Sequence, residues 1–390
     1  MEVGLQVVSH CSTVNANRKY DIAIAGGGLA GLSLSIQLAR KGFGVCLFEK
    51  ETYPFHKVCG EYISMESWDF LTSLGLPLEK WDLPVIDQIC LTASNGESIR
   101  AKLPLGGFGI SRYKLDAALA EIAKKEGVAL YENTKVHDIR FENSGHQIQT
   151  NIGLFTALVA CACFGKKSNL DVKWKRRFLL DKEEHNYIGV KYHVKAAQPE
   201  QQISLHNFPG GYCGISRIEE GKYCLCYLTR SGNLKDSHQS IPEMEENILK
   251  QNPALRKLLE EIEILYDEPI TIAQISFSKK TQIENHVLCI GDAAGMIAPL
   301  CGNGMSMALH ASKIAVGSIS GFLNNQITRA AMESTYQKRW RRLFGNRLRT
   351  GRLIQRFFGN AFWSGLLINT MKPFPSVIRA LIRKTHGERF

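Results

Sequence analysis

The sequence contains no C-x-x-C pair among its 11 cysteines. Such pairs supply most ligand sets of iron–sulfur clusters and zinc ribbons, so we expect no metal site. Cys161/Cys163 and Cys224/Cys226 stand at strand spacing inside apolar runs, which is typical of buried thiols in a reducing cytosol. Residues 1–18 lack the basic start and apolar core of a signal peptide. We therefore expect a cytoplasmic protein.

A transmembrane segment is not expected either. The longest uncharged stretch near the C-terminus, residues 357–371, is too short and too often interrupted by glycine and asparagine to span a bilayer. Any membrane contact should then be peripheral.

The net charge of +11 does not indicate a nucleic-acid partner, because it is confined to one segment. Residues 335–390 hold 13 Lys/Arg and one acidic residue, whereas the other 35 basic and 36 acidic residues balance. Trp340, Phe344 and Trp363 are interleaved with these charges, a pattern found in segments that lie on a membrane surface. The alternative is that these helices pack on the rest of the protein and display their charges to water.

A βαβ pattern opens the part of the sequence that carries recognisable chemistry. Residues 20–25 form an apolar run with strand character, residues 29–41 have helical periodicity, and residues 45–48 form a second apolar run. A glycine-rich turn separates the first strand from the helix, and an acid follows the second strand. The combination predicts a dinucleotide-binding unit.

Each glycine of the turn has a separate expected role. Gly26 permits the tight turn, Gly28 lets the backbone approach a diphosphate, and Gly31 allows the helix to pack closely on the strand. The helix N-terminus then offers N–H groups to the phosphates. Glu49 is placed to accept hydrogen bonds from the ribose of an adenosine. This unit alone does not distinguish FAD from NAD.

A second motif indicates a flavin. Residues 286–290 form a short apolar run that ends in Gly291 and Asp292, followed by Pro299 and a glycine-rich helix start. An aspartate there suits the hydroxyls of a ribityl chain, which NAD lacks. N–H groups at the helix start would stabilise the negative charge of a reduced flavin. Since no second G-x-G-x-x-G follows a predicted strand, NAD(P)H should either bind only transiently as a reductant or be replaced by another electron donor.

Together these motifs resemble the flavoprotein superfamily of aromatic hydroxylases and geranylgeranyl reductases. The segment PFHKVCGEYIS at 54–64 resembles the geranylgeranyl reductase branch, and the S-R-x-x-L-D match at 111–116 implies that Arg112 contacts FAD. The segment 206–228 is similar to the substrate-sheet motif of these reductases, which implies that Phe208 and Tyr212 line the substrate pocket, although the usual tryptophan is missing. The expected cofactor contacts are Gly26, Gly28, Ala30, Gly31, Glu49, Lys50, Arg112, Val136, Gly291, Asp292, Pro299, Gly302, Gly304 and Met305.

The fold class that follows is α/β. We expect a Rossmann-like FAD-binding domain of glutathione-reductase type, with an inserted, mainly antiparallel substrate sheet and a C-terminal helical segment. The FAD domain is predicted at 18–75, 100–167 and 280–330, the substrate domain at 76–99 and 168–279, and the basic helical segment at 331–390. Further expected elements are strands at 188–194, 203–208, 212–218 and 223–229, and one helix at 242–263 capped by Ser240.

Three functions are compatible with these motifs. The first is a reductase that saturates a carbon–carbon double bond of an isoprenoid or other small apolar substrate. The second is a monooxygenase of an aromatic or polyketide-derived ring, and the third is a membrane-associated flavin electron carrier or quinone-linked dehydrogenase. Phe164 stands where hydroxylases of the superfamily carry an Asp-Gly motif, and the W-x-W-x-I-P motif of flavin halogenases is absent. The Cys59-Gly60-Glu61 segment, the departure at Phe164 and the apolar, basic tail favour the reductase.

Cys59 and Gly60 are the expected catalytic pair. The loop after Glu49 can carry Cys59 to the flavin, where a thiol could give a proton to the carbon that does not receive the hydride. The alternative is a small residue that only lets the loop pass near the ring, with Gly60 supplying the unusual backbone angles.

Overall fold

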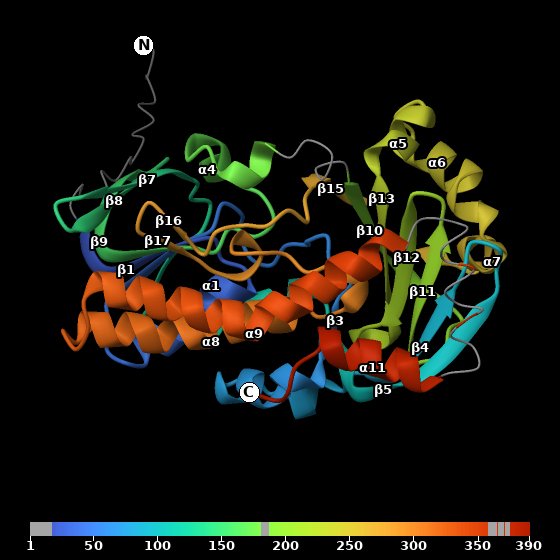
Figure 1. Cartoon of the computed structure of the whole chain (residues 1–390), viewed down its shortest axis with the longest axis horizontal. Helices are drawn as coiled ribbons and strands as arrows, with labels where there is room; N and C mark the ends of the chain where they lie inside the picture. The colour runs from blue at the N-terminus through green and yellow to red at the C-terminus, as the bar shows by residue number, and fades with distance from the viewer. Residues whose placement is uncertain (1–17, 181–186, 358–364, 366–369, 371–374) are drawn as a thin grey trace, which may run out of the picture.

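The computed structural model describes residues 18–180, 187–357, 365, 370 and 375–390. In this part of the chain two β-sheets lie side by side, with long helices under the first sheet and shorter ones around the second (Figure 1).

The first sheet has a parallel centre formed by the predicted βαβ unit. β1 pairs in parallel with both β2 and β9, and β17 adds to β9 in the same direction. The antiparallel β7 and β8 extend it beyond β9. Its central strands are buried on both faces, which explains their continuous apolar runs. The strands of this sheet are β1 Arg18–Ala25, β2 Val45–Phe48, β6 Ala129–Tyr131, β7 Val136–Glu142, β8 Gly145–Thr150, β9 Gly153–Ala162, β16 Ile283–Glu284 and β17 Val287–Cys289.

The second sheet is mainly antiparallel, with one parallel pair between β11 and β4. It includes β3 and the whole of β5, so residue 100, where a domain boundary is predicted, lies inside a strand of this sheet. The division into domains otherwise stays a prediction. The strands are β3 Tyr62–Ser64, β4 Val85–Thr92, β5 Ser98–Gly109, β10 Tyr187–Lys195, β11 Gln202–Phe208, β12 Gly211–Arg217, β13 Tyr223–Arg230, β14 Glu263–Ile264 and β15 Ile270–Ile275.

Helices cover both sheets. α1, α8 and α9 pack in the core that they share with the first sheet, whereas α6 and α7 contribute to a second core against β10, β12 and β13. α11 lies beside β5 (Figure 1). The helices are α1 Leu29–Ala39, α2 Trp68–Ser73, α3 Arg112–Lys125, α4 Asn169–Lys173, α5 Ser231–Asp236, α6 Ile241–Asn247, α7 Pro253–Glu261, α8 Gly304–Leu323, α9 Arg329–Phe357 and α11 Pro375–Thr385.

The single helix predicted over 242–263 is wrong. Ser240 does cap a helix start, since its side chain accepts a hydrogen bond from the Glu243 N–H, but α6 ends at Asn247. Asn252 then caps a new helix, α7, whose first residue is Pro253. Proline lacks the N–H that a continuous helix needs, so it is tolerated only in the first turn.

The aromatic residues of the basic segment do not all face outward. Trp340 and Phe344 on α9 are buried in the first core and stack on each other edge to face, with ring centroids 5.5 Å apart. These two side chains therefore support packing rather than lipid contact, and Trp363 lies outside the described residues. Peripheral membrane contact through the basic residues stays a prediction. Among the described helices none is long and apolar enough to cross a membrane.

Candidate functional site

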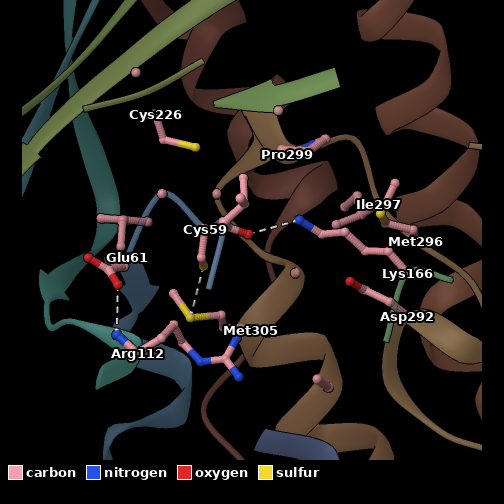
Figure 2. A pocket seen from close by; sticks show the side chains of 18 of the residues that line it. Cys59, Glu61, Arg112, Lys166, Cys226, Asp292, Met296, Ile297, Pro299 and Met305 are labelled. Carbon is pink, nitrogen blue, oxygen red and sulfur yellow. Dashed lines mark hydrogen bonds between the residues drawn. The ribbon is translucent and has the colours of Figure 1, made fainter. Parts of the chain in front are cut away.

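A cavity of about 1290 Å³, including its opening to solvent, lies between the two sheets. One wall is formed by the start of α1, the loop after β17 and the start of α8. The opposite wall is the second sheet, which contributes Ile203, Leu205, Tyr212, Gly214 and Leu228. The sequence motifs for phosphate, ribityl and substrate binding therefore converge on one cavity (Figure 2).

The glycines of the first motif pack as their expected roles require. Gly26 has φ +107°, and a Cβ there would lie 2.6 Å from the Cys163 carbonyl carbon and oxygen on the neighbouring strand end. A Cβ on Gly31 would overlap the carbonyl oxygen of Gly26. The approach of α1 to the sheet thus depends on the absence of side chains at both positions.

Two cations flank the N-terminus of α1. Gly28 is its N-cap and provides no side-chain cap, so the first N–H groups of the helix remain available to an anion. A Cβ on Gly28 would lie 3.5 Å from Arg112 Nη2 and 3.8 Å from Lys57 Nζ. This combination of helix N–H groups and two positive side chains fits a diphosphate.

Asp116 holds both cations in place. Its carboxylate accepts hydrogen bonds from Arg112 at 2.8 and 2.7 Å and from Lys57 at 3.1 Å. Burial alone would raise the pKa of Asp116, but the charges of Arg112 and Lys57 hold it below its usual range. The sequence pointed to Arg112, but it left out Lys57 because a loop lysine is usually a surface residue. The position of Lys57 beside α1 depends on its hydrogen bond to Asp116, which lies 59 residues further along the chain.

Glu49 closes the other side of the turn. Its carboxylate accepts hydrogen bonds from the Gly27 N–H at 2.9 Å and the Glu51 N–H at 3.2 Å. The side chain is buried and does not line the cavity, so its contact with the ribose of an adenosine stays a prediction. Lys50 points away instead: its side chain is 68% exposed and pairs with Glu51.

Asp292 faces the cavity from the loop after β17, next to the Lys166 side chain (Figure 2). Lys166 donates to the Val58 carbonyl at 3.0 Å, and Lys280 donates to the Asp292 carbonyl at 3.0 Å. Burial raises the pKa of Asp292, and the charges of the two lysines oppose this shift. The Asp292 side chain lines the cavity, where its carboxyl oxygens would accept hydrogen bonds from ligand hydroxyls.

The start of α8 forms the remaining part of this wall. Pro299, Gly302, Gly304 and Met305 all line the cavity, together with Ala30 from α1. Gly302 has φ +63°, and a Cβ there would lie 3.0 Å from the Tyr62 ring. The first N–H groups of α8 are therefore placed at the cavity, as the sequence predicts.

Cys59 also lines the cavity, and its thiol lies 3.5 Å from Met305 Sδ (Figure 2). The Cys59 carbonyl accepts a hydrogen bond from Cys224 Sγ at 3.2 Å. Under the alternative interpretation Gly60 supplies the unusual backbone angles of this loop, but its φ is not positive. The residue with positive φ in this loop is Glu61, at 55°.

Glu61 is the residue that the sequence analysis missed. Its buried carboxylate lies 2.5 Å from Lys191 Nζ and 2.6 Å from His193 Nε2, and it accepts a hydrogen bond from the Arg112 N–H at 2.8 Å. Glu61, His193 and Cys224 place their ligand atoms within 4.8 Å of one another. The Lys191 ammonium already occupies the position of a cation on this carboxylate, so we assign no metal here.

Of three further predicted site residues, only one lines the cavity. Tyr212 lines the cavity, but Phe208 is fully buried in the second core, where it packs edge to face on Tyr227. Tyr212 pairs with Asn207 across β11 and β12, so the next residue, Phe208, faces the other side of the sheet. Val136 begins β7 and does not line the cavity.

Comparison with known proteins supports a flavin cofactor. Residues 19–152 match the model of the FAD binding domain family. This range contains α1, Glu49, Cys59 and Arg112.

Relatives extend beyond this domain. The chain is 27% identical over 360 residues to conditioned medium factor receptor 1 of Dictyostelium discoideum, covering 84% of this chain and 68% of that protein. It is 25% identical over 346 residues to a digeranylgeranylglycerophospholipid reductase of Methanococcus vannielii, covering 83% of this chain and 82% of that protein. The flavin-dependent brominase Bmp2 has the same fold, with a TM-score of 0.76, 18% identity, and coverage of 94% of this chain and 93% of the brominase. The chain thus carries a match to an FAD binding domain at residues 19–152, and over most of its length it is similar in sequence to a digeranylgeranylglycerophospholipid reductase and in fold to a flavin-dependent brominase.

Proposed function

We propose that the protein is an FAD-dependent reductase of carbon–carbon double bonds in an apolar, isoprenoid-like substrate. The observation that carries the proposal is the Cys59 thiol, which lines a cavity whose opposite wall is apolar. The sheet contributes Ile203, Leu205 and Leu228 to this wall, and these side chains suit a hydrocarbon chain rather than a charged substrate. The similarity to a digeranylgeranylglycerophospholipid reductase supports the same class of substrate.

In this proposal the chain positions two reactants and supplies a proton. When bound, FAD supplies the hydride. Arg112, Lys57 and the start of α1 would hold its diphosphate, and Asp292 would hold its ribityl hydroxyls. Cys59 donates a proton to the alkene carbon that does not receive the hydride. NAD(P)H is proposed as the transient source of electrons.

We expect Cys59→Ala to slow anaerobic substrate reduction by about 100-fold or more, because a positioned general acid contributes 10² or more to such rates. Cys59→Ser should be slowed less, since a hydroxyl retains a transferable proton. The measurement is reoxidation of prereduced flavin by geranylgeraniol without oxygen. Cys226→Ser is the matched control, because Cys226 also lines the cavity and should keep the wild-type rate (Figure 2).

Oxygen consumption distinguishes the reductase from a monooxygenase. If both Cys59 variants retain the wild-type rate with normal FAD content, the thiol is not the proton donor. If substrate turns over only with stoichiometric oxygen consumption, the protein is a monooxygenase and the reductase proposal fails.

Removal of the Asp292 carboxylate tests the cofactor site independently of the substrate. We expect Asp292→Ala to weaken FAD binding by about 30-fold, because one charged hydrogen-bond acceptor contributes about 2 kcal/mol. Asp292→Asn, which keeps an acceptor oxygen, should lose less. The dissociation constant is measured by flavin fluorescence with the apoprotein. Asp267→Ala, at an exposed carboxylate, is the control; equal affinity of Asp292→Ala and this control would contradict the assignment.

A further inference from the structure

A second cavity, of about 1370 Å³ including its opening, lies on the far side of Tyr62. It is bounded by β5, α9, α11 and the residues that follow α11 (Figure 1). The Tyr62 side chain lines both cavities and separates the second from the one that contains Cys59. None of the motifs found in the sequence accounts for this second cavity.

Three polar atoms at this cavity are buried without a hydrogen-bond partner among the described residues: Tyr62 Oη, His310 Nδ1 and His386 Nε2. Arg347 Nη1, at the same cavity, lies 3.6 Å from Glu66 Oε2. Tyr62 is only 5% exposed. A buried polar group without a partner typically costs about 1–3 kcal/mol, and native structures contain few of them. Three around one cavity are therefore unusual and point to a polar ligand group.

The donors among these atoms favour an anion. The Tyr62 hydroxyl and the Arg347 guanidinium donate, and His310 donates from Nδ1 in one tautomer. His386 donates from Nδ1 to the Ile382 carbonyl at 3.0 Å, so its Nε2 accepts until the ring is protonated. Such a set of several donors and one acceptor suits a phosphate monoester, which carries acceptor oxygens and, as a monoanion, one O–H group.

The charges around the cavity are predominantly positive. Arg347, Arg383 and Arg389 line it, against the single acidic lining residue Glu388. Glu66 lies 3.6 Å from Arg347 and pairs with it; burial raises the pKa of the Glu66 carboxyl and lowers the pKa of the Arg347 guanidinium. Burial also lowers the pKa of His310 to about 4, so this ring is neutral at physiological pH and serves as a hydrogen-bond donor rather than as a cation.

The rest of the lining is apolar. It consists of Leu103, Pro104 and Leu105 from β5, Leu343 from α9, Ile382 from α11, and Phe390. Phe390 stacks on His310 with ring centroids 4.1 Å apart, which fixes the end of the chain against α8. A ligand in this cavity would thus meet hydrogen-bond donors at one end and hydrocarbon along its sides.

We infer that this second cavity binds an amphiphilic phosphate monoester, with the phosphate at Tyr62, His310 and Arg347 and the alkyl chain along β5 and α11. The site lies apart from the cofactor cavity and does not depend on the reaction proposed above.

The test is calorimetric titration of the FAD-loaded protein with octyl phosphate, with inorganic phosphate and octanol in separate titrations. Loading with FAD blocks only the cofactor part of the first cavity, so Arg347→Met, at a residue that lines the second cavity alone, is titrated in parallel and should lose the binding; wild-type affinity in this variant would place octyl phosphate elsewhere and overturn the inference. We expect octyl phosphate to bind at least tenfold more tightly than either fragment. Equal affinity for inorganic phosphate would show a simple anion site, and equal affinity for octanol a simple apolar pocket; either result, or no binding of octyl phosphate, would overturn the inference.

Tyr62→Phe separates a ligand contact from a structural role. The variant keeps the ring between the two cavities and removes only the hydroxyl. We expect it to weaken octyl phosphate binding about tenfold while the Tm of the ligand-free protein stays unchanged or rises, because the hydroxyl is buried without a partner. Tyr113→Phe, on a ring outside the cavity, is the matched control. Wild-type affinity in Tyr62→Phe would remove Tyr62 from the site and overturn the proposed phosphate position.

Discussion

Gly31→Ala is expected to lower the free energy of unfolding by about 3 kcal/mol and to reduce the FAD content of the purified protein. The added methyl group would overlap the Gly26 carbonyl oxygen and lie 3.3 Å from the Cys163 side chain, so α1 must move away from the sheet. Because Gly28 begins the same helix, this movement also displaces the N–H groups that face the cavity. Urea unfolding of the apoprotein and the flavin absorbance per chain measure the two effects.

Gly345→Ala provides the matched control. Gly345 is also helical, in α9, but a Cβ there meets no atom within 4 Å. Alanine should then stabilise the protein by up to about 1 kcal/mol through its higher helix propensity. If the two variants had the same stability and FAD content, the close packing of α1 on the Gly26 turn would contribute neither to stability nor to FAD binding.

The parts of the fold that could be predicted from the sequence are those set by local signals. β2 was predicted with its observed bounds, and β1 and α1 within a few residues, because apolar runs and glycines mark their ends. The strands β10 to β13 were likewise predicted within a residue or two at each end. The break in the helix predicted at 242–263 could also be found from local signals. Asn252 and Pro253 together mark a helix start, but the prediction followed the apolar periodicity alone.

The parts of the site that could not be predicted depend on long-range contacts. Glu61 meets Lys191 and His193 across 130 and 132 residues. No sequence spacing indicates such an encounter, and a strand with alternating lysine and histidine normally places them in solvent. The separation of Phe208 from Tyr212 depends on strand register, because a shift of one residue exchanges the two faces of a strand.

The unusual backbone angle in the Cys59 loop shows the same dependence. Glycine is the usual residue at positive φ, so Gly60 was the natural choice from sequence. Glu61 adopts it instead, because its carboxylate is fixed by hydrogen bonds to β10 and to the start of α3. These contacts compensate the strain of a non-glycine residue in that region.

The anchoring role of Glu61 leads to the other large expected effect. Glu61→Gln should lower the free energy of unfolding by about 3–5 kcal/mol at neutral pH, because it leaves the Lys191 ammonium buried without its counter-charge. Burial alone would raise the pKa of Glu61, but the hydrogen bond with His193 and the charge of Lys191 hold it below its usual value. The folded state then binds fewer protons than the unfolded state. This stabilisation is therefore present above the unfolded pKa of about 4.3 and is lost as the pH falls through the folded pKa.

The double variant Glu61→Gln/Lys191→Met distinguishes loss of the ion pair from loss of packing. Removal of both charges should recover much of the stability, because no uncompensated charge remains and methionine fills a similar volume. Urea unfolding between pH 3.5 and 7.5 should show the acid-dependent loss in the wild type and a flatter profile in both variants. The loop should also loosen in Glu61→Gln, so that iodoacetamide alkylates Cys59 faster than in the wild type, with the buried Cys224 as an internal comparison. A double variant no more stable than Glu61→Gln, together with unchanged alkylation of Cys59, would mean that the ion pair does not hold the Cys59 loop against the second sheet.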